Sequence, residues 1–244
     1  MSPGIFVTST DTGVGKTVVT AGILRWLRNQ GIDVVPMKPV QTGGIPGGDR
    51  LVAPDLEFCI SASGIRPDVR ELQLMSPYVY EPACSPHLAG RMSQQYAEPS
   101  KIKDCADKLL QGHRALVVEG AGGVMAPLNE SSTMLDLMKM LAYPVVLVSR
   151  FGLGTINHTL MSIQALRTFE IRIIGVVFNH TAKPRPEDRL VEQDNPDAIA
   201  QFGNVRVLGR LRYLNSLSSK SEDVWSLFEE DMTGLNNILD ELGV

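Results

Sequence analysis

The stretch that decides the fold lies near the N-terminus and reads IFVTSTDTGVGKT over residues 5–17. Residues 5–8 are apolar or β-branched and predict a short buried strand. The helical pattern of residues 17–30 follows, and Gly31 marks its end. A strand, a glycine-containing turn and a helix in this order are the context that a phosphate-binding loop requires, although Thr10 stands where the strict motif has glycine.

This loop predicts a binding site for a nucleoside triphosphate. Small residues let backbone N–H groups surround phosphate oxygens, and the following helix adds the partial positive charge of its N-terminus. Lys16 can reach the β- and γ-phosphates, and the Thr17 hydroxyl can bind Mg²⁺. A glycine-rich turn with a solvated lysine is the structural alternative, and the flanking strand and helix argue against it.

Outside the loop, apolar runs alternate with helical patterns. We expect strands at 34–40, 115–118, 145–148, 171–178 and 205–208, and helices at 55–61, 86–95, 100–111, 155–168 and 222–242. Pro36 and Pro39 weaken the 34–40 strand or place it at a sheet edge, and 41–54 is expected to be a loop. Apolar strands separated by helices favour a doubly wound α/β domain, with a mainly parallel sheet and helices on both faces, formed by one domain over 1–244.

Composition narrows the function classes. The 244 residues carry a formal net charge of −4 with scattered basic residues, so nucleic-acid binding is not expected. Three cysteines without a C-x-x-C pair predict reduced thiols, and four dispersed histidines form no metal set. No apolar run is long enough for a membrane span, and the first residues lack a signal-peptide pattern, so we expect a cytoplasmic protein without membrane partners.

Two further segments lie where predicted strands end, at the edge where open α/β sheets bind ligands. One is VEGAGG, residues 118–123, in which the Glu119 carboxylate can hold Mg²⁺ directly or through water. The other is MKPVQTG, residues 37–43, which places Lys38 and Thr42 at the end of the second strand. Taken singly, Lys38 is more often a surface lysine and Glu119 a satisfied acid at a strand end, so the two segments indicate a function only together with the phosphate loop.

Together the segments resemble the dethiobiotin synthetase family. The resemblance covers residues 5 to about 210, and its motifs occur in the family's order: TDTGVGKT (10–17), KPVQTG (38–43), an acid at Asp55, SPH (85–87), VEGAGG (118–123), GLGTINH (152–158) and FNH (178–180). It implies a P-loop fold, a cytoplasmic homodimer with the site at the subunit interface, and Mg²⁺ with ATP as co-substrate.

The resemblance also implies a role for individual residues. Lys16 and Lys38 would be the catalytic lysines, and Thr17, Asp55 and Glu119 would surround Mg²⁺. Thr12 and Thr42 would contact the diamine or its carbamate. The partner subunit would bind the substrate carboxylate through its copies of Gly154, Thr155 and Asn157. The nucleotide would contact the following set: Gly13, Val14, Gly15, Lys16, Thr17, Val18, Asp55, Glu119, Gly120, Ala121, Gly122 and Asn179.

The family's reaction implies the substrates 7,8-diaminopelargonate, CO₂ or bicarbonate, and ATP. One amine captures CO₂ as a carbamate, whose oxygen attacks the γ-phosphate to give a mixed carbamic–phosphoric anhydride and ADP. The second amine then closes the ureido ring of dethiobiotin and expels phosphate. Such phosphoryl transfer depends mostly on positioning and charge stabilisation, for which lysines and Mg²⁺ suffice.

Three departures from the family pattern stand out. Ser9 replaces the usual glycine at the exit of the first strand, and Asp55 lies between Pro54 and Leu56 instead of serine and alanine. The proline that often follows the last core strand is missing from LGRLRY, residues 208–213, where Arg212 stands. This last change bears on recognition of the nucleotide base.

Three other functions remain to be weighed. A switch ATPase of the DNA-positioning or cell-division kind usually carries a second lysine five residues before the loop lysine, where this chain has Asp11. A cobyrinate-type amidating synthetase needs a glutaminase domain, for which the chain is too short. A nonenzymatic nucleotide-binding module is disfavoured if Lys38 and Glu119 both approach the γ-phosphate.

Overall fold

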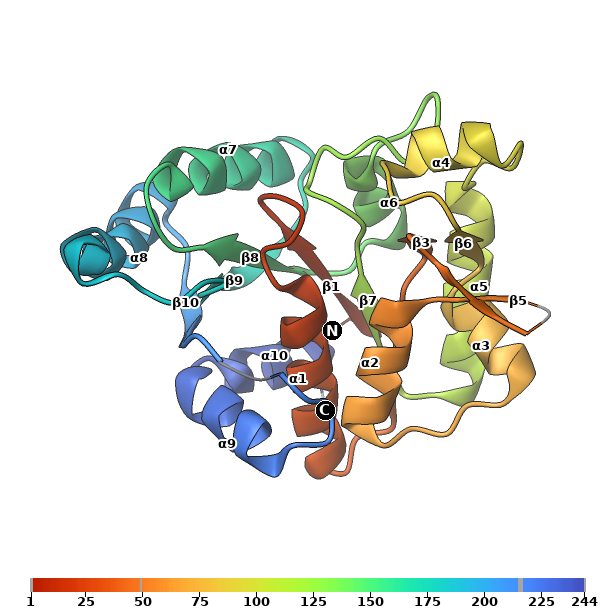
Figure 1. Cartoon of the computed structure of the whole chain (residues 1–244), viewed down its shortest axis with the longest axis horizontal. Coiled ribbons are helices and arrows are strands. Elements are labelled where there is room, and N and C mark those ends of the chain that lie inside the picture. The colour runs from red at the N-terminus through yellow and green to blue at the C-terminus, as the bar shows by residue number, and fades with distance from the viewer. Residues whose placement is uncertain (1, 49, 215–216, 244) are drawn as a thin grey trace.

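The computed structural model describes residues 2–48, 50–214 and 217–243 and builds them around a six-stranded sheet (Figure 1). The spatial order is β10-β9-β8-β1-β7-β2, and every neighbouring pair is parallel. The strands are β1 (Gly4–Ser9), β2 (Val34–Met37), β7 (Ala115–Glu119), β8 (Val145–Arg150), β9 (Ile173–Asn179) and β10 (Val207–Leu211). The doubly wound parallel sheet expected from the sequence is confirmed.

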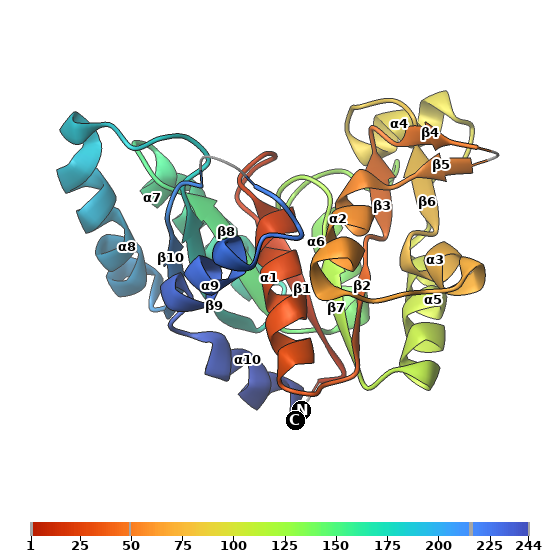
Figure 2. The same ribbon diagram turned by 60° about the horizontal axis from the view of Figure 1, so that its bottom comes forward.

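Successive side chains of each strand point to opposite faces of the sheet, and each face carries its own core. Ile5 and Val7 of β1 pack on one face, while Phe6 between them packs on the other. The first face is covered by α1 (Lys16–Asn29), α9 (Glu222–Asp231) and α10 (Leu235–Leu242), which Figure 2 shows together in front of the sheet. Because both faces are covered, most of each strand is apolar, whereas polar residues such as Ser9, Glu119 and Asn179 stand at the carboxyl ends.

The other face is covered by more helices, and one helix reaches both cores. This second layer contains α3 (Val69–Met75), α4 (Pro86–Met92), α5 (Pro99–Gly112), α6 (Met134–Leu141), α7 (Thr155–Thr168) and α8 (Arg189–Gly203). Helix α2 (Pro54–Ser63) contributes Leu56 to this core and Cys59 to the first. A short 3₁₀ turn, η1 (Pro186–Asp188), precedes α8.

The segment expected as one strand at 34–40 is two strands. Its first part, β2, is the edge strand of the main sheet, as the prolines suggested. The backbone then leaves the sheet, because the Lys38 amide donates to the Met75 carbonyl at 2.8 Å and Pro39 has no N–H to donate. The second part, β3 (Val40–Thr42), pairs instead with β6 (Tyr78–Tyr80). Within the region expected as a loop, β4 (Ile45–Gly47) and β5 (Arg50–Val52) form a hairpin.

The C-terminal region is also divided. The single helix expected at 222–242 is wrong, because the chain breaks between α9 and α10. At the break, the Gly234 amide donates to the Leu208 carbonyl at 2.8 Å, and a Cβ on Gly234 would lie 2.7 Å from the Leu208 Cα. The close approach of β10 therefore forces the interruption. Strand β10 itself begins two residues later than expected.

Within the described ranges, no helix has the length and apolarity that a bilayer crossing demands.

Candidate functional site at the carboxyl edge of the sheet

The loop between β1 and α1 is shaped for phosphate. Gly13 and Gly15 have φ values of 75° and 97°, in the left-handed region that favours glycine. Gly15 caps α1 without any side-chain hydrogen bond. In the part of the chain that the structure describes, the amides of residues 13–17 donate to no protein acceptor. These N–H groups and the helix N-terminus, which we call the cradle, are together suited to bind an anion.

Asn179 supports this loop from the end of β9. Its Nδ2 donates to the Val14 carbonyl at 2.9 Å, and a Cβ on Gly15 would lie 2.1 Å from the same nitrogen. Position 15 therefore requires glycine for both its conformation and its contact. The Asn179 side chain, expected near the nucleotide base, lies directly against the phosphate loop.

Lys16 turns back over the loop that precedes it. Its Nζ donates to the Ser9 Oγ at 2.9 Å and to the Asp11 carbonyl at 3.3 Å, and the side chain is almost entirely buried. Burial, and then the nearby positive charge of Lys38, lower the pKa of Lys16 to about 8. The ammonium thus lies in the cradle with much of its hydration removed, where a bound phosphate would stabilise its charge.

A cluster of opposite charges lies beside the loop. The Lys38 Nζ is 2.6 Å from Glu119 Oε1 and 2.7 Å from Asp55 Oδ2, and it also donates to the Gly120 carbonyl at 3.3 Å. The Thr17 hydroxyl donates to the same Glu119 oxygen at 2.9 Å. Three segments far apart in sequence therefore meet at one carboxylate, which places Glu119 at the centre of the cluster.

The Lys38 ammonium stays charged in spite of its burial. Burial alone would lower the pKa of Lys38, but the Glu119 and Asp55 carboxylates together outweigh it and raise that pKa above its ordinary value. The two lysines of the site therefore differ, since Lys38 is held as a cation by acids and Lys16 is not.

These residues line one cavity of about 390 Å³ at the carboxyl ends of the strands. Its volume lies within the range of small-molecule sites. The predicted site residues along its wall are Thr12, Gly13, Gly15, Lys16, Thr17, Lys38, Thr42, Asp55, Glu119, Ala121 and Gly122, joined by Val40 and Gln41. The structure thus gathers both predicted lysines and both predicted acids around a single space.

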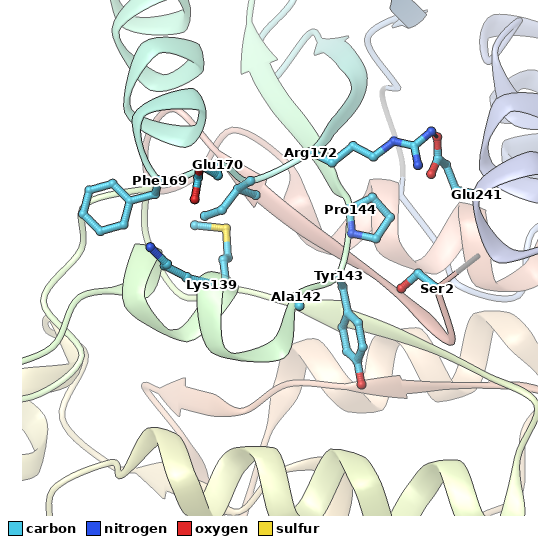
Figure 3. A pocket seen from close by; sticks show the side chains of 11 residues that line it. Ser2, Lys139, Ala142, Tyr143, Pro144, Phe169, Glu170, Arg172 and Glu241 are labelled. Carbon is cyan, nitrogen blue, oxygen red and sulfur yellow. Dashed lines mark ion pairs between the residues drawn. The ribbon is translucent and has the colours of Figure 1, made fainter.

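A second cavity, of about 340 Å³, lies at the opposite edge of the sheet (Figure 3). Ser2, Pro144 and Arg172, which precede β1, β8 and β9, contribute to its wall. Figure 3 shows Arg172 reaching toward Glu241, with which it forms a 2.7 Å ion pair. Ligand sites of open α/β sheets lie at the carboxyl edge, so this amino-edge cavity is not the candidate site.

The part of the molecule where the nucleotide base is expected to bind has only a small cavity. Val18, Asn179 and Arg212 line a small cavity of about 20 Å³, behind the phosphate loop. The Arg212 guanidinium, standing where the family often has proline, is held by Asp231 and Glu230. The structure therefore brings Val18 and Asn179 together, with a charged side chain beside them.

The residues predicted to bind the substrate carboxylate lie elsewhere. Gly154 caps the N-terminus of α7 with φ 88°, and Asn157 is exposed on the first turn. The Thr155 side chain is buried, and its hydroxyl proton is already used in a hydrogen bond to the Arg150 carbonyl at 2.6 Å. None of the three lines the 390 Å³ cavity. The Thr155 amide donates to the Gly152 carbonyl at 3.4 Å, so among the described residues the N–H groups of residues 154, 156 and 157 and the Asn157 side chain are what this turn can offer to a ligand.

The sequence reasoning missed two residues of the site. Gln41 links the cluster to α2, because its Oε1 accepts from the Asp55 amide at 3.3 Å and its Nε2 donates to the Thr42 carbonyl at 2.8 Å. Its place inside KPVQTG was the available signal. Cys59 lies beneath the cluster, 4.0 Å from Glu119 Oε2, and burial followed by the Glu119 charge raises the pKa of its thiol well above the ordinary value. It is therefore an uncharged packing residue.

The donor set suits a hard divalent cation. Thr17, Asp55 and Glu119 offer one hydroxyl and two carboxylates, which are ligand types that Mg²⁺ prefers. A cation already lies between the two acids, namely the Lys38 ammonium. Among the described residues, no group of three or more His, Cys, Asp or Glu side chains could hold a metal by itself, so Mg²⁺ here would depend on phosphate oxygens as further ligands.

The chain is similar to known proteins over most of its length. A family model described as an AAA domain matches residues 3–221. The chain is 40% identical over 224 residues to the "ATP-dependent dethiobiotin synthetase BioD" of Anaeromyxobacter dehalogenans (strain 2CP-1), covering 92% of this chain and 96% of the relative. It is 34% identical over 227 residues to the protein of the same name from Halalkalibacterium halodurans, covering 93% and 88%.

A solved structure shares the fold at low sequence identity. The structure titled "MinC:MinD cell division protein complex, Aquifex aeolicus" matches with a TM-score of 0.56 and 14% identity, covering 99% of this chain and 94% of that one. At this identity the similarity concerns the fold alone.

Proposed function

The chain belongs to the family of ATP-dependent dethiobiotin synthetases, and from that premise we propose how the cavity at the carboxyl edge carries out the reaction. The enzyme uses ATP to convert 7,8-diaminopelargonate and CO₂ into dethiobiotin, ADP and phosphate, a step of biotin biosynthesis. The observation that supports our assignment best is the meeting of Lys16 and Lys38 in one cavity with Glu119 between the phosphate loop and the second lysine.

We assign the triphosphate to the cradle of residues 13–18. Backbone N–H groups and the N-terminus of α1 would hold the β- and γ-phosphates, and the Lys16 ammonium would neutralise them. The lowered pKa of Lys16 favours this role, because a buried cation without a carboxylate partner gains most from an incoming phosphate. Asn179 and Val18 would lie toward the base.

Lys38 would act on the reacting groups rather than on the resting phosphates. Its ammonium can leave one carboxylate and donate to the carbamate or to the γ-phosphate, where negative charge develops. Mg²⁺ would be held by Thr17, Asp55 and Glu119, and when bound it would supply further neutralisation of the phosphate charge. Gln41 would orient Asp55 for this purpose.

The diamine would enter beside Thr12, in the phosphate loop, and Thr42, at the end of β3. There the carbamate formed on one amine can lie in line with the γ-phosphate, so its oxygen takes the phosphoryl group as the bond to ADP breaks. The second amine then attacks the carbamoyl carbon, closes the ring and releases phosphate. No protein nucleophile is required, and the protonated thiol of Cys59 fits that reading.

We further propose a homodimer in which the α7 turn of the partner completes the site. The N-terminal turn at residues 154–157 lies outside the cavity of its own chain, and the N–H groups of residues 154, 156 and 157 suit a carboxylate. Leu153 and Met161 leave large apolar side chains exposed on the same segment, which an isologous interface would cover. Use of ATP as co-substrate supports the cytoplasmic location expected from the sequence.

The function is tested by incubating the protein with ATP, Mg²⁺, bicarbonate and 7,8-diaminopelargonate, and following phosphate release together with the mass of the product. We expect phosphate release that depends on the diamine, with dethiobiotin and ADP formed in equal amounts. Lys16→Ala should lower kcat by at least ~10²-fold, since it removes a major electrostatic group. Rapid ATP hydrolysis indifferent to the diamine would instead indicate a switch ATPase.

The shared site is tested by mixing two inactive variants. Lys38→Ala disables the cavity, and Asn157→Ala with Gly154→Pro disables the α7 turn. If the sites are shared, a mixed dimer contains one site with both defects and one intact site, so mixing should restore turnover that neither variant has alone. Absence of recovery in dimers shown by mass spectrometry to be mixed would place the whole site within one chain.

A further inference from the structure

Ser9 occupies a position that connects three parts of the site. It is the last residue of β1, is fully buried, and pairs in register with Val148 of β8. Its carbonyl accepts from the Val124 amide at 3.1 Å, which ties it to the segment after β7. Its hydroxyl lies under the phosphate loop, so Ser9 is in contact with the walls of the cavity on both sides.

The hydroxyl of Ser9 has well-defined hydrogen bonds. It accepts from the Lys16 Nζ at 2.9 Å and donates its own proton to the Asp11 carbonyl at 2.6 Å, with the Gly122 carbonyl at 3.2 Å as a second acceptor. The donor is thus used within the loop, and a lone pair is left facing the ammonium. An uncharged oxygen can hold the Lys16 ammonium there without neutralising its charge, whereas a carboxylate would neutralise it.

We propose that Ser9 is a positioning residue for Lys16, the phosphate-binding lysine. Its hydroxyl anchors the Lys16 ammonium in the cradle before ATP binds and keeps this contact when ATP is bound. The inference rests on the proposed function, because it takes Lys16 as the lysine that meets the phosphates. Family members with glycine at this position lack the side-chain oxygen and would hold the lysine only through main-chain carbonyls.

Two features of the geometry support retention of the contact. Lys16 Nζ has three protons, of which Ser9 and Asp11 use two, so one remains for a phosphate oxygen. Lys16 also lines the 390 Å³ cavity while bound to Ser9, so it need not leave the hydroxyl to reach a ligand there. A long side chain held in this way has lost its rotamer freedom before binding rather than during it.

The effect should appear in binding of ATP and not in the chemical step. Ser9→Ala leaves the Lys16 charge in the cradle and removes only its anchor, which holds the lysine in the same place in the ground state and in the transition state. Loss of the anchor therefore changes KM and leaves kcat in place. A hydrogen bond to a charged group corresponds to about a tenfold change in affinity.

The experiment compares the wild-type protein with Ser9→Ala and with Thr8→Val under steady-state conditions. Thr8 is the matched control, because it is the preceding residue of β1, is equally buried, and within the described residues its hydroxyl has no hydrogen-bond partner. We expect Ser9→Ala to raise the KM for ATP about tenfold, to change kcat less than about twofold and to leave the KM for the diamine unaltered. Thr8→Val should match the wild type in all three.

Calorimetric titration with ADP provides a measurement independent of turnover, and Ser9→Gly, which carries the family's usual residue, replaces Ser9→Ala if the latter does not fold. An unchanged KM for ATP in the folded variants would overturn the inference. A lowered KM would overturn it too, because the hydroxyl would then compete with phosphate for the lysine. Failure of the wild type to form dethiobiotin would instead refute the proposed function, so the two outcomes are distinguishable.

Discussion

At the level of single side chains, the two lysines of the site respond differently to pH. The pKa of Lys16 is lowered to about 8, first by burial and then by Lys38, whereas neighbouring carboxylates raise the pKa of Lys38. As pH rises through about 8, Lys16 of the empty enzyme therefore loses its proton while Lys38 keeps its own. A bound triphosphate favours the charged form, so binding in this range requires proton uptake.

We therefore expect affinity for ATP, measured without Mg²⁺ by calorimetry, to weaken between pH 7 and pH 9.5. Titrations at pH 8 to 9 in two buffers of different ionisation enthalpy should reveal proton uptake. Lys16→Ala should bind ATP weakly and with little pH dependence over this window. Equal proton uptake in both proteins would assign the titration to another group.

Replacing Lys38 should show how strongly the two neighbouring carboxylates destabilise the fold when they have no cation between them. In Lys38→Met, Glu119 remains buried without its cation, and breaking such a pair is expected to lower the free energy of unfolding by about 3–5 kcal/mol. Lys103→Met is the control, because Lys103 and Asp107 form an exposed pair worth no more than about 1 kcal/mol.

Mg²⁺ should restore part of the stability lost in Lys38→Met, since a divalent cation can take the place of the ammonium between Glu119 and Asp55. Thermal unfolding without nucleotide, with and without millimolar MgCl₂, measures this. A Mg²⁺-dependent increase in the melting temperature of the variant, larger than that of the wild type, is the expected result. Identical shifts in both would argue against a metal role for these carboxylates.

Only some side chains of the site could be predicted from the sequence, and the reason is physical. Lys16, Thr17 and Glu119 could be selected from the sequence, because their chemistry follows from a local motif at a strand end. The hydrogen bond from Lys16 to Ser9 could not, since it depends on how far the loop curls back. Ser9 was visible only as a departure from the family pattern, without a partner.

At the level of helices and strands, local patterns identified the elements that carry their own signals. The helix expected at 155–168 has the bounds of α7, and β1 extends by one residue at each end. Strands of three residues, such as β3 and β6, are too short to show a hydrophobic periodicity. They form because they pair with each other, which the local sequence does not reveal. Helices α3 and α6 do begin with capping boxes, at Asp68 and Thr133, so their starts were available in the sequence.

The break between α9 and α10 leads to a test at the same scale. Gly234→Ala should lower the free energy of unfolding by about 1–3 kcal/mol, because the new Cβ would lie 2.7 Å from a backbone atom of Leu208 that cannot rotate away. Gly112→Ala is the matched control at the end of α5, where a Cβ meets nothing within 4 Å, and it should be neutral or stabilise by up to about 1 kcal/mol. The measurement is urea unfolding of both variants. Equal unfolding midpoints would mean that β10 and residue 234 can move apart at little cost in free energy.

At the level of the whole molecule, the last helix belongs to the same core as the first strand. Leu235, Ile238 and Leu242 of α10 share the core that contains Ile5 and Val7 of β1. Figure 2 shows the two ends of the chain side by side, and the Ser2 amide donates to the Glu241 carbonyl at 3.0 Å. The core on this face of the sheet is therefore complete only when α10 is in place beside α1 and α9.

A protein that stops after residue 232 should lose cooperative folding. It forgoes three buried side chains, each worth roughly 1.5–3 kcal/mol, against a typical total stability of about 5–15 kcal/mol. Thermal unfolding followed by circular dichroism is the measurement. Asn236→Ala, an exposed change on the same helix, should leave the transition in place to within about 0.5 kcal/mol. A truncated chain with the wild-type transition would show that α10 is dispensable.

The packing of α10 against β1 also has a consequence for synthesis on the ribosome. Strand β1 ends at Ser9 and α10 begins at Leu235, so the strand leaves the exit tunnel long before the helix that completes its core. At about 5–20 residues per second, α1 can cover Ile5 and Val7 soon after they emerge, but the core that they share with α10 stays incomplete for many seconds. We therefore expect this core to be completed, and the fold around the phosphate loop to become stable, only after α10 has emerged.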